Sequence, residues 1–109
     1  MSKARVLVTD GEQRAALAIV RSLGAAGYEV YVCGPRSRSL AGASRFAQRQ
    51  AAVPDPLRCA AAFTADVRRL VERWGIDVVV PVSEGSLLAL LPERDSLHGA
   101  RIPFASLEA

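Results

Sequence analysis

The sequence predicts an α/β domain in which helices cover both faces of a mostly parallel, five-stranded sheet. Three observations indicate this class. Short apolar runs rich in β-branched residues alternate with longer segments of helical periodicity. Glycine or proline stands at most of the junctions between these segments. The apolar runs also lack the strict alternation of strands with one solvated face, so we expect central strands that are buried on both faces.

The first predicted unit is a strand, a helix and a second strand. The apolar run 5–9 forms the first strand, and an amphipathic helical pattern follows it as far as Gly27, where glycine supplies a stop. The run 28–33 forms the second strand and ends at Gly34-Pro35. We therefore expect the two strands to lie parallel and to be joined by a right-handed crossover.

The turn between the first strand and the helix is predicted to be a capped junction rather than a phosphate loop. A dinucleotide-binding loop needs two or three glycines at fixed spacing, and this turn contains Gly11 alone. Thr9 and Glu12 have the spacing of a capping box, and Asp10 is an equally good N-cap. The two carboxylates in this turn would also repel an incoming phosphate.

The middle of the chain predicts a short helix over 43–47 and a short edge strand over 50–53. Asp55 is expected to cap the second helix and Pro56 to open it, because proline at the first helical position loses no hydrogen bond. This helix ends at Gly75 and carries an apolar stripe at helical spacing. The stripe consists of Phe63, Val67, Leu70, Val71 and Trp74. Such spacing indicates core packing rather than a ligand platform.

The last third of the chain predicts two more strands around a third helix. The run 76–82 is the most apolar strand, a helix begins among the leucines at 87–91, and Pro92 kinks or ends it. A last short strand is predicted over 101–104. The expected strand order is 3-2-1-4-5, in a single three-layer, Rossmann-like domain over residues 1–109.

Composition excludes several classes of function. The net charge of +3 comes from basic residues that are nearly all arginine and are interspersed with acids, so nucleic acid is not an expected partner. Cys33 and Cys59 lack metal-ligand spacing and His98 is the single histidine, so we expect reduced cysteines and no metal site. Without an apolar run of about 18 residues or an apolar N-terminal signal core, no membrane partner is expected, and the predicted location is cytoplasmic.

The turns after the first and fourth strands form the first candidate site. These strands are predicted neighbours, and ligands of α/β proteins bind beyond the carboxyl ends of such strands. The candidate substrate-binding residues are Asp10, Gly11, Glu12, Ser83 and Glu84. Glu84 can accept hydrogen bonds from a substrate ammonium or hydroxyl group; the alternative is that Ser83 or Glu84 only caps the third helix. No catalytic set is predicted, since neither Ser83 nor Ser86 lies in a G-x-S-x-G turn.

The second candidate is a group of arginines without acidic neighbours, since no acid occurs between Glu29 and Asp55. The group consists of Arg36, Arg38, Arg45 and Arg49. The first two follow the second strand, where NADP-binding folds place cations against the 2′-phosphate, although the glycine-rich turn of those folds is absent. The alternative is a solvated loop or an interdomain contact. The last two can hold their loop against an acidic partner or a substrate carboxylate.

Five short motifs occur in a fixed order along nearly the whole chain. They are V-L-V-T-D-G at 6–11, L-A-G-A-S-R-F at 40–46, V-P-D-P at 53–56, D-V-V-V-P-V-S-E at 77–84 and I-P-F at 102–104. Together they resemble the N-terminal, pre-ATP-grasp domain of ATP-grasp enzymes, in particular those similar to the large subunit of carbamoyl-phosphate synthase. Their order and separation carry the resemblance more than any single motif does.

The resemblance implies a parent enzyme that is a carboxylate–amine or carboxylate–thiol ligase. Such enzymes use ATP and magnesium to form an acyl phosphate, which a nucleophile then captures. ATP and the metal bind between two later domains, so residues 1–109 are expected to be a domain excised from a longer chain, with no catalytic residue or cofactor of its own.

The expected partners are the C-terminal ATP-grasp domains of the same chain and a small-molecule acceptor substrate. The loops after the first and fourth strands would help to bind that substrate. Two alternatives remain at this point: a fragment of an NADP-binding oxidoreductase, and a stand-alone interaction module without a ligand.

Overall fold

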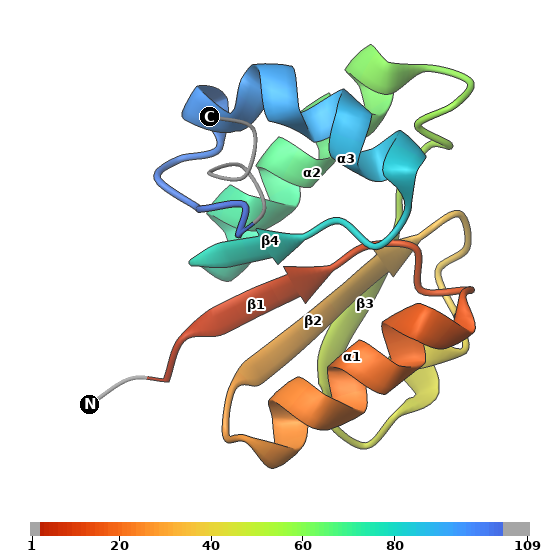
Figure 1. Ribbon diagram of the computed structural model, residues 1–109, viewed down its shortest axis with the longest axis vertical. Coiled ribbons are helices and arrows are strands. Elements are labelled where there is room, and N and C mark those ends of the chain that lie inside the picture. Colours follow the sequence, from red (N-terminus) through yellow and green to blue (C-terminus); the bar gives the residue numbers. More distant parts are fainter. Residues whose placement is uncertain (1–2, 104–109) are drawn as a thin grey trace.

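The computed structural model describes residues 3–103, and four parallel strands form the sheet at its centre. The strands are β1 (Arg5–Val8), β2 (Glu29–Gly34), β3 (Ala47–Ala52) and β4 (Val78–Val80). Their order in the sheet is β3-β2-β1-β4 (Figure 1), and Leu7 of β1 pairs with Tyr31 on one side and Val79 on the other. The predicted α/β class and the order of the first four strands are confirmed.

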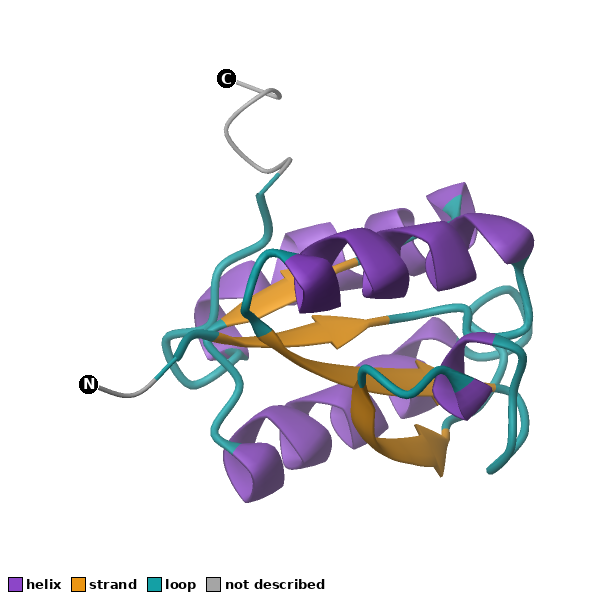
Figure 2. Ribbon diagram, turned by 90° about the horizontal axis from the view of Figure 1, so that it is seen from below, coloured by secondary structure: helices purple, strands orange, loops and turns teal. Residues whose placement is uncertain are grey.

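Helices cover both faces of this sheet, which gives the predicted three layers (Figure 2). The helices of the described part are α1 (Arg14–Ala25), α2 (Ala60–Trp74) and α3 (Glu84–Leu90), with 3₁₀ turns η1 (Ala41–Ala43) and η2 (Leu91–Ser96). Val6 and Val8 pack with α1, whereas Leu7 packs with α2 and α3 on the opposite face. β1 is therefore buried on both faces, as its unbroken apolar run predicts.

The predicted fifth strand does not form among the described residues, so the sheet has four strands rather than five. Arg101 makes one isolated parallel bridge with Val78, in which the Val79 amide donates to the Arg101 carbonyl at 2.8 Å. Pro103 follows closely and has no N–H with which to extend a ladder. Phe104, the last residue of the predicted strand, lies outside the described residues.

The second helix starts later than predicted. α2 begins after Cys59, whose Sγ accepts a hydrogen bond from the Ala62 amide at 3.4 Å. Asp55 does not cap this helix; its Oδ1 instead accepts a hydrogen bond from the Leu57 amide at 2.9 Å. A side-chain turn of this kind competes with helix formation, so the segment around Pro56 stays in a loop.

Other element boundaries also follow from local chemistry. β3 covers 47–52 instead of 50–53. In place of the short helix expected over 43–47, the chain forms the 3₁₀ turn η1 at 41–43. The Ser39 hydroxyl, just before this turn, accepts a hydrogen bond from the Gly42 amide at 3.0 Å. β4 stops before Pro81, which cannot donate to a ladder. α1 and α2 end as predicted before glycines with positive φ, Gly27 at 97° and Gly75 at 64°.

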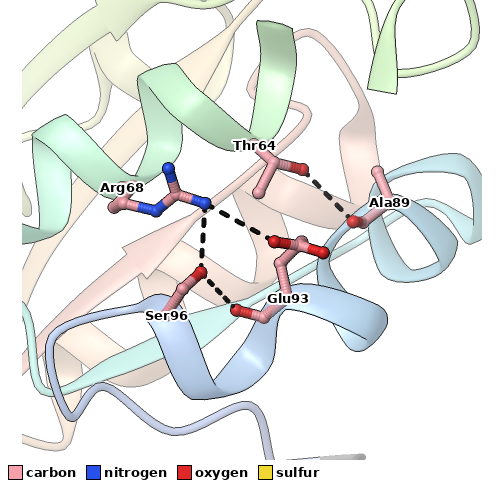
Figure 3. Close-up of polar contacts among 5 residues, drawn as sticks. All are labelled: Thr64, Arg68, Ala89, Glu93 and Ser96. Carbon is pink, nitrogen blue, oxygen red and sulfur yellow. Dashed lines mark hydrogen bonds and ion pairs between the residues drawn. The ribbon is translucent and has the colours of Figure 1, made fainter. Parts of the chain in front are cut away.

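Polar contacts join α2 to the segment formed by α3 and η2 (Figure 3). The buried Thr64 hydroxyl donates to the Ala89 carbonyl at 3.2 Å. One turn further along α2, Arg68 Nη2 donates to Ser96 Oγ at 3.0 Å and lies 3.7 Å from the Glu93 carboxylate. α3 ends at Leu90, and Pro92 falls in the first turn of η2, so the proline marks the end of the helix as expected. No helix within residues 3–103 has the length and apolar character needed to span a membrane.

Candidate functional site

The loops that follow β1 and β4 are joined by the side chain of Asp10. Its Oδ2 accepts a hydrogen bond from the Ser83 amide at 3.0 Å, and its Oδ1 accepts one from the Ser83 hydroxyl at 2.9 Å. Asp10 is only 9% exposed. The two loops therefore lie side by side at the carboxyl edge of the sheet, as the predicted neighbourhood of the first and fourth strands requires.

Two chains of hydrogen bonds in this cluster end at the Asp10 carboxylate. The Val82 amide donates to Thr9 Oγ1 at 3.0 Å, and the Thr9 hydroxyl in turn donates to Asp10. The Ser86 amide donates to Ser83 Oγ at 3.1 Å, and the Ser83 hydroxyl in turn donates to Asp10. A carboxylate is an acceptor only, so it suits the end point of both chains. Ser83 is thereby the N-cap of α3, which confirms the capping interpretation for this residue.

The turn after β1 is not the predicted capping box. α1 begins after Gln13, whose side chain makes no cap hydrogen bond. Asp10 has φ 58°, in the left-handed region that aspartate tolerates better than most residues, and its carbonyl accepts a hydrogen bond from the Gln13 amide at 2.9 Å. The chain thus makes a turn before the helix starts, and the Asp10 carboxylate is directed to the β4 loop instead of to α1.

A cavity of about 240 Å³ lies beside the joined loops. Its lining comes from the loops after β1 and β4, from the end of β2, from the loop between β3 and α2, and from α2 and the first turn of α3. The polar lining residues are Asp10, Glu12, Gln13, Asp55 and Ser83, and the others are Gly34, Pro35, Val53, Pro54, Pro56, Leu57, Phe63 and Gly85. This is the position at which parallel α/β sheets bind ligands.

Gly34 permits the close approach of the loops that follow β1 and β2. A Cβ atom at Gly34 would lie 3.0 Å from the Gly11 nitrogen and 3.3 Å from Glu12 Oε1. Gly11 is buried, and its amide donates to the Cys33 carbonyl at 3.0 Å. The Glu12 carboxylate consequently lies over the end of β2, at the edge of the cavity.

Cys33 lies beneath this turn and stays protonated. Burial raises the pKa of the Cys33 thiol, and the nearby carboxylates of Asp10 and Glu12 raise it further. A thiol in such surroundings is neither a nucleophile nor a metal ligand at neutral pH. Cys33 and Cys59 are both free, as expected, with Cys59 exposed. Within residues 3–103, no group of His, Cys, Asp or Glu side chains is arranged to hold a metal ion.

The predicted substrate-binding residues differ in their relation to the cavity. Asp10, Glu12 and Ser83 line it, whereas Gly11 is buried behind it. Glu84 is exposed in the first turn of α3 and does not line the cavity. Its carboxylate there complements the positive end of the helix dipole. Binding of a substrate by any of the five residues stays a prediction.

The four predicted arginines do not converge on the cavity. Arg36 and Arg38 are exposed in the loop after β2 and do not line it. The Arg45 guanidinium lies 4.9 Å from the centre of the Phe46 ring, as in a cation–π contact. Arg49 is exposed on β3. Their roles as anion or interdomain contacts stay predictions.

The apolar side of the cavity was not predicted. Its residues include Leu57, Phe63 and members of the motif V-P-D-P, where the sequence predicts a helix start. The helical spacing of Phe63 predicts core packing, and the residue is indeed buried, with only 1% exposed. The available signal was Leu57, an apolar residue between Pro56 and Arg58 in a segment without helical periodicity.

The parallel sheet covered on both faces and the cavity at its carboxyl edge define a Rossmann-like α/β domain. One solved structure similar to it is that of glycinamide-RNase-transformylase T from Mycobacterium tuberculosis, with a TM-score of 0.62 and 23% sequence identity. The match covers 91% of this chain and 28% of that chain, so this chain corresponds to less than a third of its length. At this identity the likeness shows a shared fold alone. No protein-family model and no curated protein sequence matches the chain.

Proposed function

We propose that this chain is the substrate-side domain of an ATP-dependent ligase and that its cavity receives the small acceptor substrate. The observation that carries this proposal is the cavity itself, placed beyond β1 and β4 and walled on one side by the loops that Asp10 and Ser83 join. The motif resemblance to pre-ATP-grasp domains supports the ligase class, and the likeness in fold to a transformylase is in keeping with it.

ATP and magnesium belong to other parts of such an enzyme in this proposal. The turn after β1 has one glycine, and the described residues that line the cavity include carboxylates but no lysine, arginine or histidine. A triphosphate requires cations or a run of free backbone amides. The cavity therefore does not fit ATP, and the nucleotide is assigned to C-terminal ATP-grasp domains of the same chain.

Calorimetry on the 109-residue chain tests the assignment of the nucleotide. We expect no heat of binding with magnesium and ATP; micromolar affinity would contradict the proposal. A parallel titration with NADPH tests the oxidoreductase alternative, which would gain support from binding that Arg36→Ala and Arg38→Ala abolish. Binding of neither nucleotide agrees with the proposed function.

Kinetics of the complete ligase test the role of the cavity. Glu12→Ala is expected to lower kcat/KM for the acceptor by about tenfold or more, with little change in melting temperature, because Glu12 is exposed and lines the cavity. Glu84→Ala tests in the same assay whether the binding surface extends to α3. Glu72→Ala, at an exposed position of α2, is the matched control. A variant with a lower melting temperature but an unchanged kcat/KM would show that its residue contributes to stability alone.

A further inference from the structure

The cavity has an apolar side whose outer part is open to solvent. Val53 and Phe63 form its buried base, with 6% and 1% of their surfaces exposed. Leu57 stands at the mouth with 82% exposed, although Gly85 lies against it: a Cβ at Gly85 would be 2.8 Å from Leu57 Cδ2. An exposed leucine beside a buried apolar base is a surface that an apolar group of a ligand can cover favourably.

The polar side of the cavity offers acceptors. Both Asp10 oxygens are occupied by Ser83 and Thr9, so this carboxylate has little capacity left for a ligand. Asp55 uses one oxygen for the Leu57 amide. Within the described part of the chain, the exposed Glu12 carboxylate receives no hydrogen bond or ion pair. The free carboxylate oxygens are therefore those of Glu12 and the second oxygen of Asp55.

Positive charge is missing from the same lining. Among the described residues that line the cavity there is no lysine, arginine or histidine. Arg14, Arg36 and Arg58 each follow a lining residue in the sequence, but all three are exposed and do not line the cavity. A phosphate or carboxylate placed here would find carboxylates in place of the cationic donors that bind it most strongly. An ammonium group has three donors and no acceptor, which matches the free oxygens of Glu12 and Asp55.

We propose that the ligand of this cavity is a small molecule with an ammonium group on an apolar body and without a phosphate or carboxylate near that group. The inference rests on the proposed function, because it names the chemical class of the acceptor. The apolar body covers Leu57 and Phe63, and the ammonium group lies between Glu12 and Asp55. A phosphorylated acceptor is excluded from this cavity.

Four probes share a branched five-carbon skeleton and differ only in their polar group. They are 3-methylbutylamine, 3-methylbutanol, 3-methylbutanoate and 3-methylbutyl phosphate. Each is titrated into the ¹⁵N-labelled chain at constant pH and ionic strength while the amide signals of Gly34, Ser83 and Gly85 are followed. We expect the amine to bind about fivefold more tightly than the alcohol, the ratio that about 1 kcal/mol from partly exposed charges produces. The two anions are expected to leave these signals unchanged.

Variants test whether Glu12 and Asp55 cause the preference for the amine over the alcohol. Glu12→Gln with Asp55→Asn is expected to reduce amine binding to that of the alcohol, and raised salt should have the same effect because both carboxylates are exposed. Glu93→Gln, at an exposed acid of η2 that does not line the cavity, is expected to change nothing.

The outcomes separate this inference from the proposed function. If an anion shifts the three amides as strongly as the amine does, the ligand class is wrong, while the cavity remains a binding site. The same conclusion follows if the amine and the alcohol bind equally. If none of the four probes shifts these amides, the cavity does not bind small molecules of this size, and both proposals fall.

Discussion

The Asp10 carboxylate accepts two hydrogen bonds from Ser83, a residue 73 positions away in the chain, one from its amide and one from its hydroxyl. Asp10 follows β1 and Ser83 follows β4, so the pair fixes two loops that are neighbours only in the folded sheet. Because Ser83 also caps α3, a single carboxylate determines both the loop geometry at the cavity and the start of a helix. Asp10 is thus expected to be important for stability whether or not a ligand touches it.

Asp10→Ala is expected to lower the free energy of unfolding by about 2–4 kcal/mol. The substitution leaves the Ser83 amide and the Thr9 hydroxyl without an acceptor and puts alanine at φ 58°. Asp10→Asn keeps an acceptor and tolerates this backbone, so it should cost less. Urea unfolding measures both, with Asp95→Ala at an exposed position as control, expected within about 0.5 kcal/mol of the unchanged protein. An Asp10→Ala value equal to the control would show that the loops hold together without this side chain.

Two glycines at the cavity are expected to respond oppositely to alanine. At Gly34 the added Cβ would press on the backbone nitrogen of Gly11 at 3.0 Å, so Gly34→Ala should destabilise by about 1–3 kcal/mol. At Gly85 the contact is the end of the exposed Leu57 side chain, which can move. Gly85 also lies within α3, where alanine is favoured by up to about 1 kcal/mol. Thermal unfolding of the two variants checks the sign, and a stable Gly34→Ala would mean that the two loops can separate.

The class of fold could be predicted because it depends on patterns within short stretches. Val6, Leu7 and Val8 are apolar on both faces of one strand, and this alone places β1 inside a covered parallel sheet. The fifth strand shows the limit of such patterns. Ile102 continues an apolar pattern, which predicts a strand, but Pro103 has no amide with which to extend the ladder.

The details of the site depend on contacts that a local pattern does not contain. Thr9 and Glu12 have capping-box spacing, yet the partner that decides the turn is Ser83, far away in the sequence. Asp55 looks like a helix cap, but one oxygen of its carboxylate accepts a hydrogen bond from the Leu57 amide within its own turn instead. The meeting of the loops after β1 and β4 could be predicted, because it follows from the strand order. The cavity wall formed by Leu57 could not, because it depends on three-dimensional packing.

The hydrogen bond from Thr64 to Ala89 gives a test of how α3 is held on α2 (Figure 3). Ala89 is near the carboxyl end of α3, where carbonyl groups lack partners within the helix. Thr64→Val has a similar shape but leaves this buried carbonyl unpaired, at an expected cost of about 1–3 kcal/mol. Thr64→Ser keeps the donor and loses one methyl group, worth about 0.8 kcal/mol. Urea unfolding compares the two, and a Val variant as stable as the Ser variant would show that the hydrogen bond contributes nothing.

The stability of the fold is expected to decrease above about pH 8.5 because of Cys33. Burial and the carboxylates of Asp10 and Glu12 hold the pKa of the Cys33 thiol in the folded state above its ordinary value. In the unfolded chain the thiol releases its proton near its ordinary pKa, so above that pH the unfolded state binds fewer protons than the folded state. The free energy of unfolding then decreases by up to about 1.4 kcal/mol per pH unit, and this contribution is absent below the unfolded pKa.

Urea unfolding between pH 7 and pH 10 measures this slope in a Cys59→Ser background, which removes the exposed thiol. Cys33→Ala in the same background is the matched control: it leaves every other titrating group in place and should flatten the curve, even though the substitution itself lowers stability at all pH values. An aromatic disulfide reagent gives an independent check, since it should modify Cys59 rapidly in the folded protein and Cys33 only on unfolding. Equal slopes with and without the Cys33 thiol, or rapid modification of Cys33 in the folded state, would mean that the turn above it opens readily to water.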